Sequence, residues 1–138
     1  MTELDDIPTP QGQLTLRLVA SRHDTNFYGD IPGGWLTYYM DQAAELAAGH
    51  EAGGRTANVA VEAMDFLCPV RVGSTVNIYT AVREIGRSSI KIDVQVWIRP
   101  PFEQNVDELY KVTEARFVMV ALDESGRIRA VSAAERTP

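Results

Sequence analysis

Two adjacent glycines and one aspartate stand out as groups suited to a reactive site. Gly33 and Gly34 stand where a loop rich in Asp, Asn, Gly and Pro gives way to an apolar helical pattern, and Asp41 follows seven residues after Gly34. The first turn of a helix carries unpaired N–H groups and partial positive charge, and glycine lets a ligand approach the backbone closely. The pair is therefore either a plain loop-to-helix junction or an N-terminus that stabilises negative charge on a reacting carbonyl.

The position of Asp41 raises a geometric difficulty. At 1.5 Å per residue it lies about 10 Å from Gly34 along the helix axis, which is far for two groups acting on one carbonyl within one chain. A seam between two chains would resolve this, with each chain contributing one group. Asp41 would then act as a general base on water or as a nucleophile that forms a mixed anhydride. The alternatives are a solvated surface acid at Asp41 and a catalytic role for Glu45 instead.

Two further segments carry polar groups of interest. Asn26 lies in the loop before the helix, where its amide could orient a water molecule or simply form a turn. The segment "GRSS" at residues 86–89 joins two strand patterns. Arg87, Ser88 and Ser89 offer a guanidinium, hydroxyls and backbone N–H groups, which could bind phosphates. The same four residues could equally be an ordinary hairpin turn.

The sequence does not favour metal chemistry or two common nucleophilic mechanisms. The only histidines, His23 and His50, have no cysteine or carboxylate at metal-ligand spacing, so we predict no metal site. Cys68 lies in the apolar stretch "FLCPV" and is expected to be buried rather than nucleophilic. No G-x-S-x-G motif is present, which disfavours an α/β-hydrolase.

Composition sets the broad class of the protein. The chain has 138 residues, 45% of them apolar, and a formal net charge of −6, as expected of one globular domain. The negative charge argues against nucleic acid or anionic membranes as partners, and no apolar run approaches the roughly 20 residues of a spanning helix. The single cysteine suits a reducing compartment. The first residues, "MTELDDIPTP", are acidic, unlike those of a signal peptide. We therefore predict a cytoplasmic protein.

Hydrophobic periodicity predicts one helix among strands. Apolar residues at three- or four-residue steps indicate a helix from Gly34 to the glycines at 53 and 54. In the first strand pattern, Leu14, Leu16 and Leu18 are expected to share one face. Strands are predicted at residues 13–20, 56–67, 75–85, 87–99 and 109–123. With no helix between the last four, the sheet should be largely antiparallel and the class α+β.

The predicted organisation is one domain at residues 13–130, with a flexible N-terminal segment at 1–12 and a C-terminal tail at 131–138. A single helix covers only one face of so long a sheet, so the sheet should wrap around it. A sheet edge would then remain uncovered and could pair with another chain. We therefore predict an obligate homo-oligomer.

Four blocks of the sequence resemble those of a known family. They are residues 24–41 (DTNFYGDIPGGWLTYYMD), 54–73 (GRTANVAVEAMDFLCPVRVG), 86–97 (GRSSIKIDVQVW) and 110–127 (YKVTEARFVMVALDESGR). Their order and spacing resemble the hotdog superfamily and, within it, the bacterial YciA-type acyl-CoA thioesterases. The resemblance implies a five- to six-stranded antiparallel sheet wrapped around a long central helix. It also implies dimers whose sheets join into one, commonly assembled as trimers of dimers.

The resemblance further implies an activity. Acyl-CoA would be hydrolysed to free fatty acid and CoA at the seam between protomers, with no metal and no cofactor, because CoA is part of the substrate. Asp41 occupies the place of the family's catalytic carboxylate and Asn26 that of its usual partner, while Gly34 is the favoured oxyanion donor. The turn at residues 86–89 becomes a candidate site for the CoA phosphates.

The sequence departs from the family at the expected acyl pocket. Tyr28 stands where relatives often have a second asparagine, and Pro32 where they usually have phenylalanine. With Trp35, these residues are the candidates for lining the acyl pocket, and the departures bear on acyl-chain preference.

Two other functions stay open at this stage. A hotdog dehydratase or hydratase would need a positioned histidine, and neither histidine lies in a matching block. A non-catalytic acyl-CoA-binding module would not need Asp41 and Asn26 together.

Overall fold

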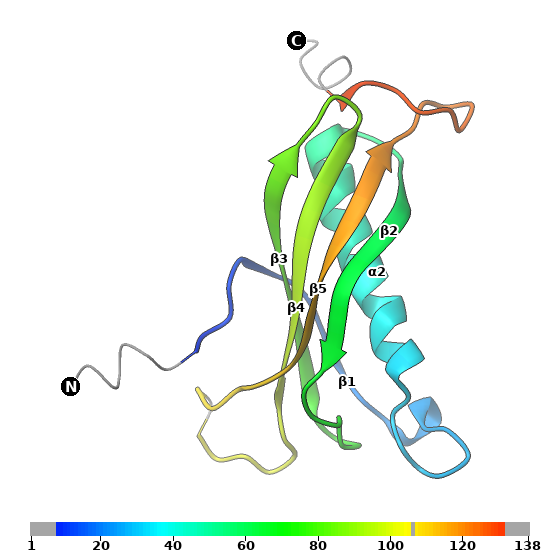
Figure 1. Ribbon diagram of the computed structural model, residues 1–138. Helices are drawn as coiled ribbons and strands as arrows, with labels where there is room; N and C mark the ends of the chain where they lie inside the picture. The colour runs from blue at the N-terminus through cyan, green and yellow to red at the C-terminus, as the bar shows by residue number, and fades with distance from the viewer. Residues whose placement is uncertain (1–7, 106, 132–138) are drawn as a thin grey trace, which may run out of the picture.

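The computed structural model describes residues 8–105 and 107–131 (Figure 1). Its elements in chain order are β1 (Gln13–Val19), a short 3-10 helix η1 (Arg22–Asp24), α2 (Gly33–Ala52), β2 (Thr56–Phe66), β3 (Thr75–Ile85), β4 (Ser89–Arg99) and β5 (Tyr110–Ala121). The α+β class, the long helix and the antiparallel sheet are confirmed. No helix formed by the described residues is long and apolar enough to cross a membrane.

The strands form one five-stranded sheet in the order β1-β3-β4-β5-β2, and every neighbouring pair is antiparallel. Strands β3, β4 and β5 follow one another in sequence and in space. Strand β2, which follows the helix directly, pairs with β5 instead of β3. Strands β1 and β2 are therefore the edges of the sheet, and the 11-residue β2 is the longer of the two.

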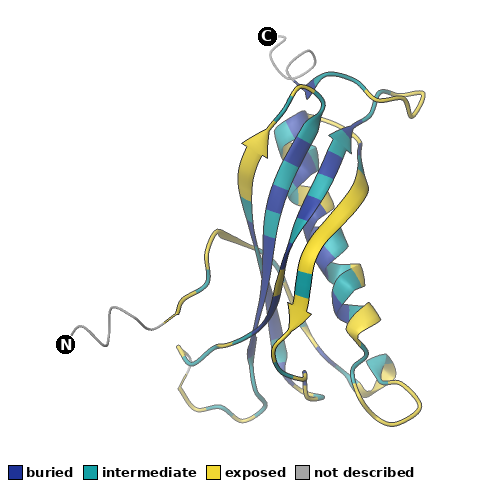
Figure 2. Ribbon diagram, in the orientation of Figure 1, coloured by how far each residue is buried: buried dark blue, intermediate teal, exposed yellow. Residues whose placement is uncertain are grey.

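The core lies between α2 and one face of the sheet. The helix contacts all five strands, and the alternate apolar residues of β4 from Ile90 to Ile98 form one buried cluster with helix residues such as Met40. Alanines at positions 43, 44, 48 and 52 are also fully buried, and their small side chains let the helix approach the sheet closely. Figure 2 shows this burial running along the strands in the middle of the sheet.

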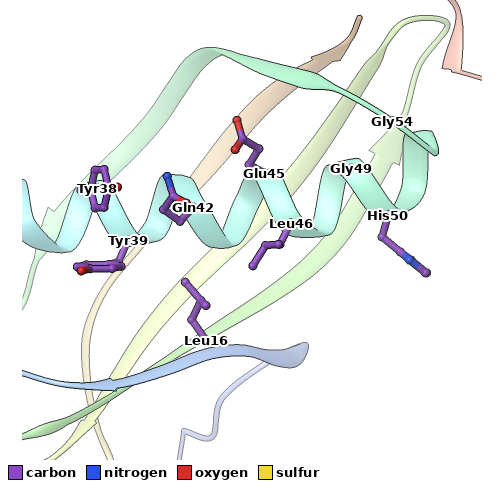
Figure 3. Close-up of a pocket in the computed structure, with 9 residues that line it drawn as sticks. All are labelled: Leu16, Tyr38, Tyr39, Gln42, Glu45, Leu46, Gly49, His50 and Gly54. Carbon is purple, nitrogen blue, oxygen red and sulfur yellow. The ribbon is translucent and has the colours of Figure 1, made fainter. Parts of the chain in front are cut away.

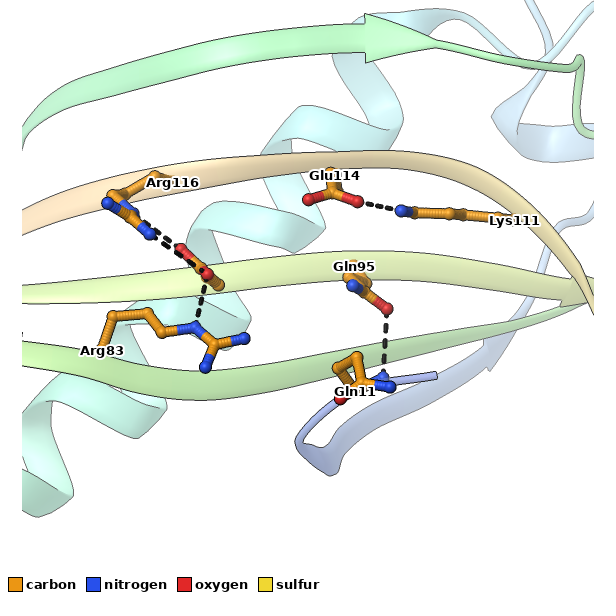
Figure 4. Close-up of polar contacts among 7 residues, drawn as sticks. Gln11, Arg83, Gln95, Lys111, Glu114 and Arg116 are labelled. Atoms are coloured by element: carbon orange, nitrogen blue, oxygen red, sulfur yellow. Dashed lines mark hydrogen bonds and ion pairs between the residues drawn. The ribbon is translucent and has the colours of Figure 1, made fainter. Parts of the chain in front are cut away.

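The opposite face of the sheet is polar and carries a network of ion pairs (Figure 4). Asp93 accepts from the Nε of Arg83 at 2.6 Å and from the Nε of Arg116 at 2.8 Å. Burial raises the pKa of the Asp93 carboxyl, but Arg116 and Arg83 outweigh it and hold the pKa below its usual value. Lys111 pairs with Glu114 on the same face. This face contributes charge to the surface but none of the predicted catalytic groups.

Strand β1 departs from the predicted alternation. Its pairing with β3 shifts register between Leu14 and Leu16. Leu16 and Leu18 pack on the core, whereas Leu14 is exposed. The prediction that all three share one face is wrong, because the bulge turns the strand by one residue.

Parts of the predicted terminal segments lie against the sheet. The N–H of Gln11 donates to Oε1 of Gln95 at 3.1 Å (Figure 4). Gly12 has a φ of 99°, and a Cβ there would lie 2.3 Å from the carbonyl oxygen of Thr80, so only glycine fits. Val131 is buried, and its N–H donates to the carbonyl of Arg87 at 2.8 Å. Residues 1–7 and 132–138 of the predicted segments lie outside the described residues.

Candidate active site

Helix α2 begins without a capping side chain. The N-cap is Pro32, with φ −73° and ψ 151°, and it makes no side-chain hydrogen bond to the helix. The N–H of Trp35 donates to the carbonyl of Pro32 at 3.0 Å, but the N–H groups of Gly33 and Gly34 have no acceptor among the described residues. Two backbone donors are thus left at the positive end of a 20-residue helix.

The two glycines differ in their surroundings. A Cβ on Gly33 would lie 3.3 Å from the ring of Phe66, whereas a Cβ on Gly34 would have no atom within 4 Å. The fold of the single chain therefore does not require glycine at position 34. The space beside Gly34 leaves room for a ligand to approach its backbone.

Asp41 is held by a residue that sequence reasoning does not identify. It is half-buried, and its Oδ1 accepts a hydrogen bond from Nδ2 of Asn58, in β2, at 3.0 Å. The Oδ1 of Asn58 accepts the N–H of Ala60 at 3.1 Å, where the pairing of β2 with β5 shifts register. Both Nδ2 and Oδ1 of the Asn58 amide are hydrogen-bonded, which fixes its orientation. Its Nδ2 occupies Oδ1 of Asp41, and Oδ2 of Asp41 is left for chemistry. The sequence offers one signal for Asn58. Asparagine is uncommon in strands, and this one lies within a clear strand pattern.

Glu45, the competing carboxylate, lies one helical turn after Asp41 and is exposed. Figure 3 shows it among the residues that line a cavity. It lines a cavity of 520 Å³ between α2 and β1 together with Tyr38, Tyr39, Leu16 and His50. Asp41 does not line this cavity. The structure thus separates the two carboxylates into different environments.

Asn26 acts as a turn former within the chain. Its Oδ1 accepts the N–H groups of Tyr28 at 2.9 Å and Asp30 at 3.0 Å. These two hydrogen bonds within the loop occupy Oδ1. Only the Nδ2 group of the Asn26 side chain has no partner among the described residues and could take another role. If Asn26 takes part in chemistry, it does so by donating to a water molecule or a carbonyl oxygen.

The 86–89 turn is a hairpin at the end of the sheet where α2 ends, opposite the start of the helix (Figure 1). The N–H of Gly86 donates to the carbonyl of Ser89 at 2.7 Å, and the carbonyl of Ser88 accepts from Ala121 at 2.9 Å. The N–H groups of Arg87 and Ser88 have no acceptor among the described residues, and Arg87 is exposed. The turn offers two donors and a guanidinium, but within one chain it is remote from Gly34.

The predicted acyl-pocket residues do not form an enclosed pocket in the single chain. Tyr28 is exposed and packs edge-on against the exposed Phe27, with centroids 5.4 Å apart. Pro32 is the N-cap, and Trp35 packs edge-on against Tyr39 at 5.0 Å. All three lie around the start of α2.

The model of the thioesterase superfamily matches residues 28–101. The acyl-CoA thioester hydrolase YciA of Salmonella typhimurium is 43% identical over 129 residues, which cover 94% of this chain and 96% of that protein. The chain belongs to the thioesterase superfamily. Among solved structures, this thioesterase resembles HI0827, a hexameric broad specificity acyl-coenzyme A thioesterase, with a TM-score of 0.86, 41% identity and coverage of 93% of this chain and 86% of that one.

A second similar structure is that of a hotdog fold thioesterase. Cj0915, a hexameric hotdog fold thioesterase of Campylobacter jejuni, matches with a TM-score of 0.79 and 28% identity, covering 86% of this chain and 90% of that one. The family resemblance and the hotdog fold are confirmed. Within this thioesterase, the described residues place Asp41 beside Asn58 but leave Gly34 and the 86–89 turn apart from them.

Neither histidine of the thioesterase joins a metal cluster. Across residues 8–105 and 107–131, no three His, Cys, Asp or Glu side chains are grouped to hold a metal ion. Cys68 is half-buried, and burial raises the pKa of its thiol, which disfavours the thiolate that a nucleophilic cysteine needs.

Proposed function

We propose that this thioesterase hydrolyses acyl-CoA thioesters to free acid and CoA, at sites shared by two copies of the chain. The observation that carries the proposal is the uncapped start of α2, with two unpaired N–H groups and open space at Gly34. The relatives named acyl-CoA thioester hydrolase, similar over nearly the whole chain, support the same reaction.

The contacts of β2 explain how two copies complete one site. At one end of β2, the ring of Phe66 lies over the first turn of α2 at Gly33. Toward its other end, Asn58 holds Asp41. If the free edges of two β2 strands pair antiparallel about a two-fold axis, the Asn58 end of one meets the Phe66 end of the other. Asp41 of one copy then faces the unpaired N–H groups of its partner.

This pairing also suits the edge itself. Strand β2 exposes Val59, Val61 and Phe66 along an unpaired edge, which is a surface that soluble proteins normally cover. We infer that a homodimer is the minimal unit and that three dimers form a hexamer, which the hexameric relatives support.

The chemistry follows from these positions. Water attacks the thioester carbonyl as Asp41 accepts its proton, and the N–H groups of Gly33 and Gly34 stabilise the oxyanion. The C–S bond then breaks and the departing sulfur takes the proton. In the nucleophilic alternative, an oxygen of Asp41 attacks the carbonyl, the CoA thiolate leaves, and water hydrolyses the resulting anhydride. Asn26 donates from Nδ2 to the water or the thioester in either case.

The CoA phosphates would lie toward the 86–89 turn. Ala121 bonds to the carbonyl of Ser88 and the adjacent Leu122 bonds to that of Arg55, just before β2. The turn is thus at the same end of the sheet as the start of β2. CoA would extend from the carbonyl toward the turn of the copy that supplies Asp41, where Arg87, Ser88 and Ser89 offer donors.

The test is thiol release from acyl-CoAs of increasing chain length, followed together with ultraviolet detection of any enoyl product. We expect free CoA and free acid in equal amounts. An enoyl-CoA product would identify a dehydratase instead, and tight acyl-CoA binding without thiol release would identify a binding module.

We also propose a cytoplasmic location. Its support is compositional: a single cysteine, which cannot form a disulfide within the chain and suits a reducing compartment.

A further inference from the structure

An apolar cavity of 390 Å³ opens beside the first turn of α2. It lies between the start of the helix and the chain that follows β2, and its lining contains no charged side chain. The residues that define it are Ile31, Gly33, Leu36, Phe66, Cys68 and Val70. Because Gly33 forms part of the wall, the cavity begins at the same backbone that carries the unpaired N–H groups.

We propose that this cavity receives the acyl chain of the substrate, and that Phe66 and Cys68 set the chain length it accepts. The inference rests on the proposed function, because it needs a thioester carbonyl held at the start of α2. From that carbonyl the substrate extends in two directions. The polar CoA runs toward the 86–89 turn of the partner, and the acyl chain enters the apolar cavity.

The walls of the cavity are fixed on one side and open on the other. Leu36 and Val70 are buried and form its floor. The N–H of Leu67 donates to the carbonyl of Val112 at 2.7 Å, which ties the segment after β2 to strand β5. In the single chain Phe66 is 48% exposed. Its ring stands at the rim of the cavity, next to the β2 edge at which we place the partner copy. A fixed, buried floor and an apolar rim would limit the length of the acyl chain that the cavity accepts.

The cavity between α2 and β1 is a poorer acyl site. Its lining includes Gln42, Glu45, His50 and the tyrosines at 38 and 39, so a methylene chain there would lie against a carboxylate and an imidazole. Burial of a methylene from water into apolar surroundings gains about fourfold in kcat/KM for each group buried. That gain requires the uncharged walls found beside Gly33.

The experiment compares kcat/KM for acetyl-, butyryl-, hexanoyl-, octanoyl- and palmitoyl-CoA in three variants. Cys68→Phe fills the cavity, Phe66→Ala removes its rim, and Leu46→Phe places the same added ring at an exposed position lining the α2–β1 cavity. We expect Cys68→Phe to lower the ratio of long-chain to short-chain kcat/KM by about tenfold or more. Phe66→Ala should shift the optimum toward longer chains, and Leu46→Phe should leave the profile unchanged.

The outcomes separate this inference from the proposed function. Active variants whose chain-length profiles match the wild type, or a profile that moves only in Leu46→Phe, would overturn the acyl cavity while leaving hydrolysis intact. If Cys68→Phe does not fold, Phe66→Ala decides alone, and size-exclusion chromatography together with thiol release from acetyl-CoA shows that its assembly and its site are intact. Wild-type protein that releases no thiol from any of the five substrates would overturn the proposed function itself, and this inference with it.

Discussion

The two ends of helix α2 are built in opposite ways. At the C-terminal end Gly53 adopts the left-handed conformation with φ 69°, and the N–H groups of Gly53 and Gly54 donate to the carbonyl of Gly49 at 2.8 and 3.2 Å. Arg129 donates from Nη2 to the carbonyl of Ala52 at 2.7 Å. At the N-terminal end Pro32 provides no capping oxygen, and two donors are left open.

The difference shows where the chain favours stability and where it favours function. A Ser, Thr, Asp or Asn at the N-cap would stabilise the helix by about 1 kcal/mol, and Pro32 forgoes that gain. A capping oxygen would also compete with a substrate oxyanion for the same N–H groups. The closed end secures the helix against the sheet, and under the proposed mechanism the N–H groups at the open end are satisfied when substrate binds. Substitutions at the two ends should therefore separate activity from stability.

Asp41→Asn should have the largest effect. The amide is nearly isosteric with the carboxylate but cannot accept the proton or attack, so kcat should fall about 10²- to 10⁴-fold with the oligomer intact. Glu45→Gln, one turn along the helix, is the matched control and should change kcat less than twofold. Steady-state kinetics with size-exclusion chromatography checks both. A larger loss in the Glu45 variant would move the catalytic role to that residue.

Gly34→Pro tests the open end of the helix directly. Proline is tolerated in the first turn but has no N–H, so loss of this oxyanion donor should lower kcat about 10²- to 10³-fold. Gly34→Ala keeps the N–H and has room for its Cβ within the chain, so a smaller loss in that variant isolates the donor. Circular dichroism should show helix content unchanged in both. Equal activity in the proline variant and the wild type would exclude a role for this N–H.

Asn58→Ala should have an intermediate effect. It leaves Oδ1 of Asp41 without its donor, and a hydrogen bond to a charged group contributes about 1.5–3 kcal/mol. We expect kcat to fall about 10- to 100-fold while KM changes little, because Asn58 positions Asp41 rather than binding CoA. Asn58→Gln is the comparison variant, with the same amide displaced by one methylene. A change confined to KM would show that Asn58 contacts substrate instead.

Arg129→Gln should affect stability but not catalysis. Its guanidinium donates to the carbonyls of Ala52, Leu122 and Ala130, and loss of these bonds should lower the free energy of unfolding by about 1–3 kcal/mol. Urea unfolding measures this, and kcat at a temperature where the variant is folded should match the wild type. Reduced kcat in a fully folded variant would contradict the division between the two ends.

The sequence predicted what depends on local pattern. The alternation of β4 and the turn at Gly86 place β3 and β4 within two residues of their observed bounds, and small residues in the helix predict its close packing. The bulge at Leu14 was missed, because a register shift depends on the partner strand. The pairing of β2 with β5 was equally hidden, since no local feature selects the far edge.

The same limit explains which parts of the site were predicted. Gly34 and Asp41 are recognisable because one helix carries both. The Asn58–Asp41 hydrogen bond depends on where β2 returns along the helix, and the cavity joins residue 33 to residues 66–70. Tyr28, which the family resemblance suggests for the acyl pocket, stays a prediction; it does not line the cavity beside Gly33.

The shared site can be tested most directly by mixing two inactive chains. Asp41→Asn and Gly34→Pro are co-expressed in equal amounts with different tags, and assemblies carrying both tags are purified beside each parent variant. If one copy supplies Asp41 and its partner supplies Gly34, random pairing within a hexamer leaves about one site in four intact, and thiol release should reach about a quarter of the wild-type rate. Mixed assemblies no more active than the two parents would place both groups in one chain and contradict the account.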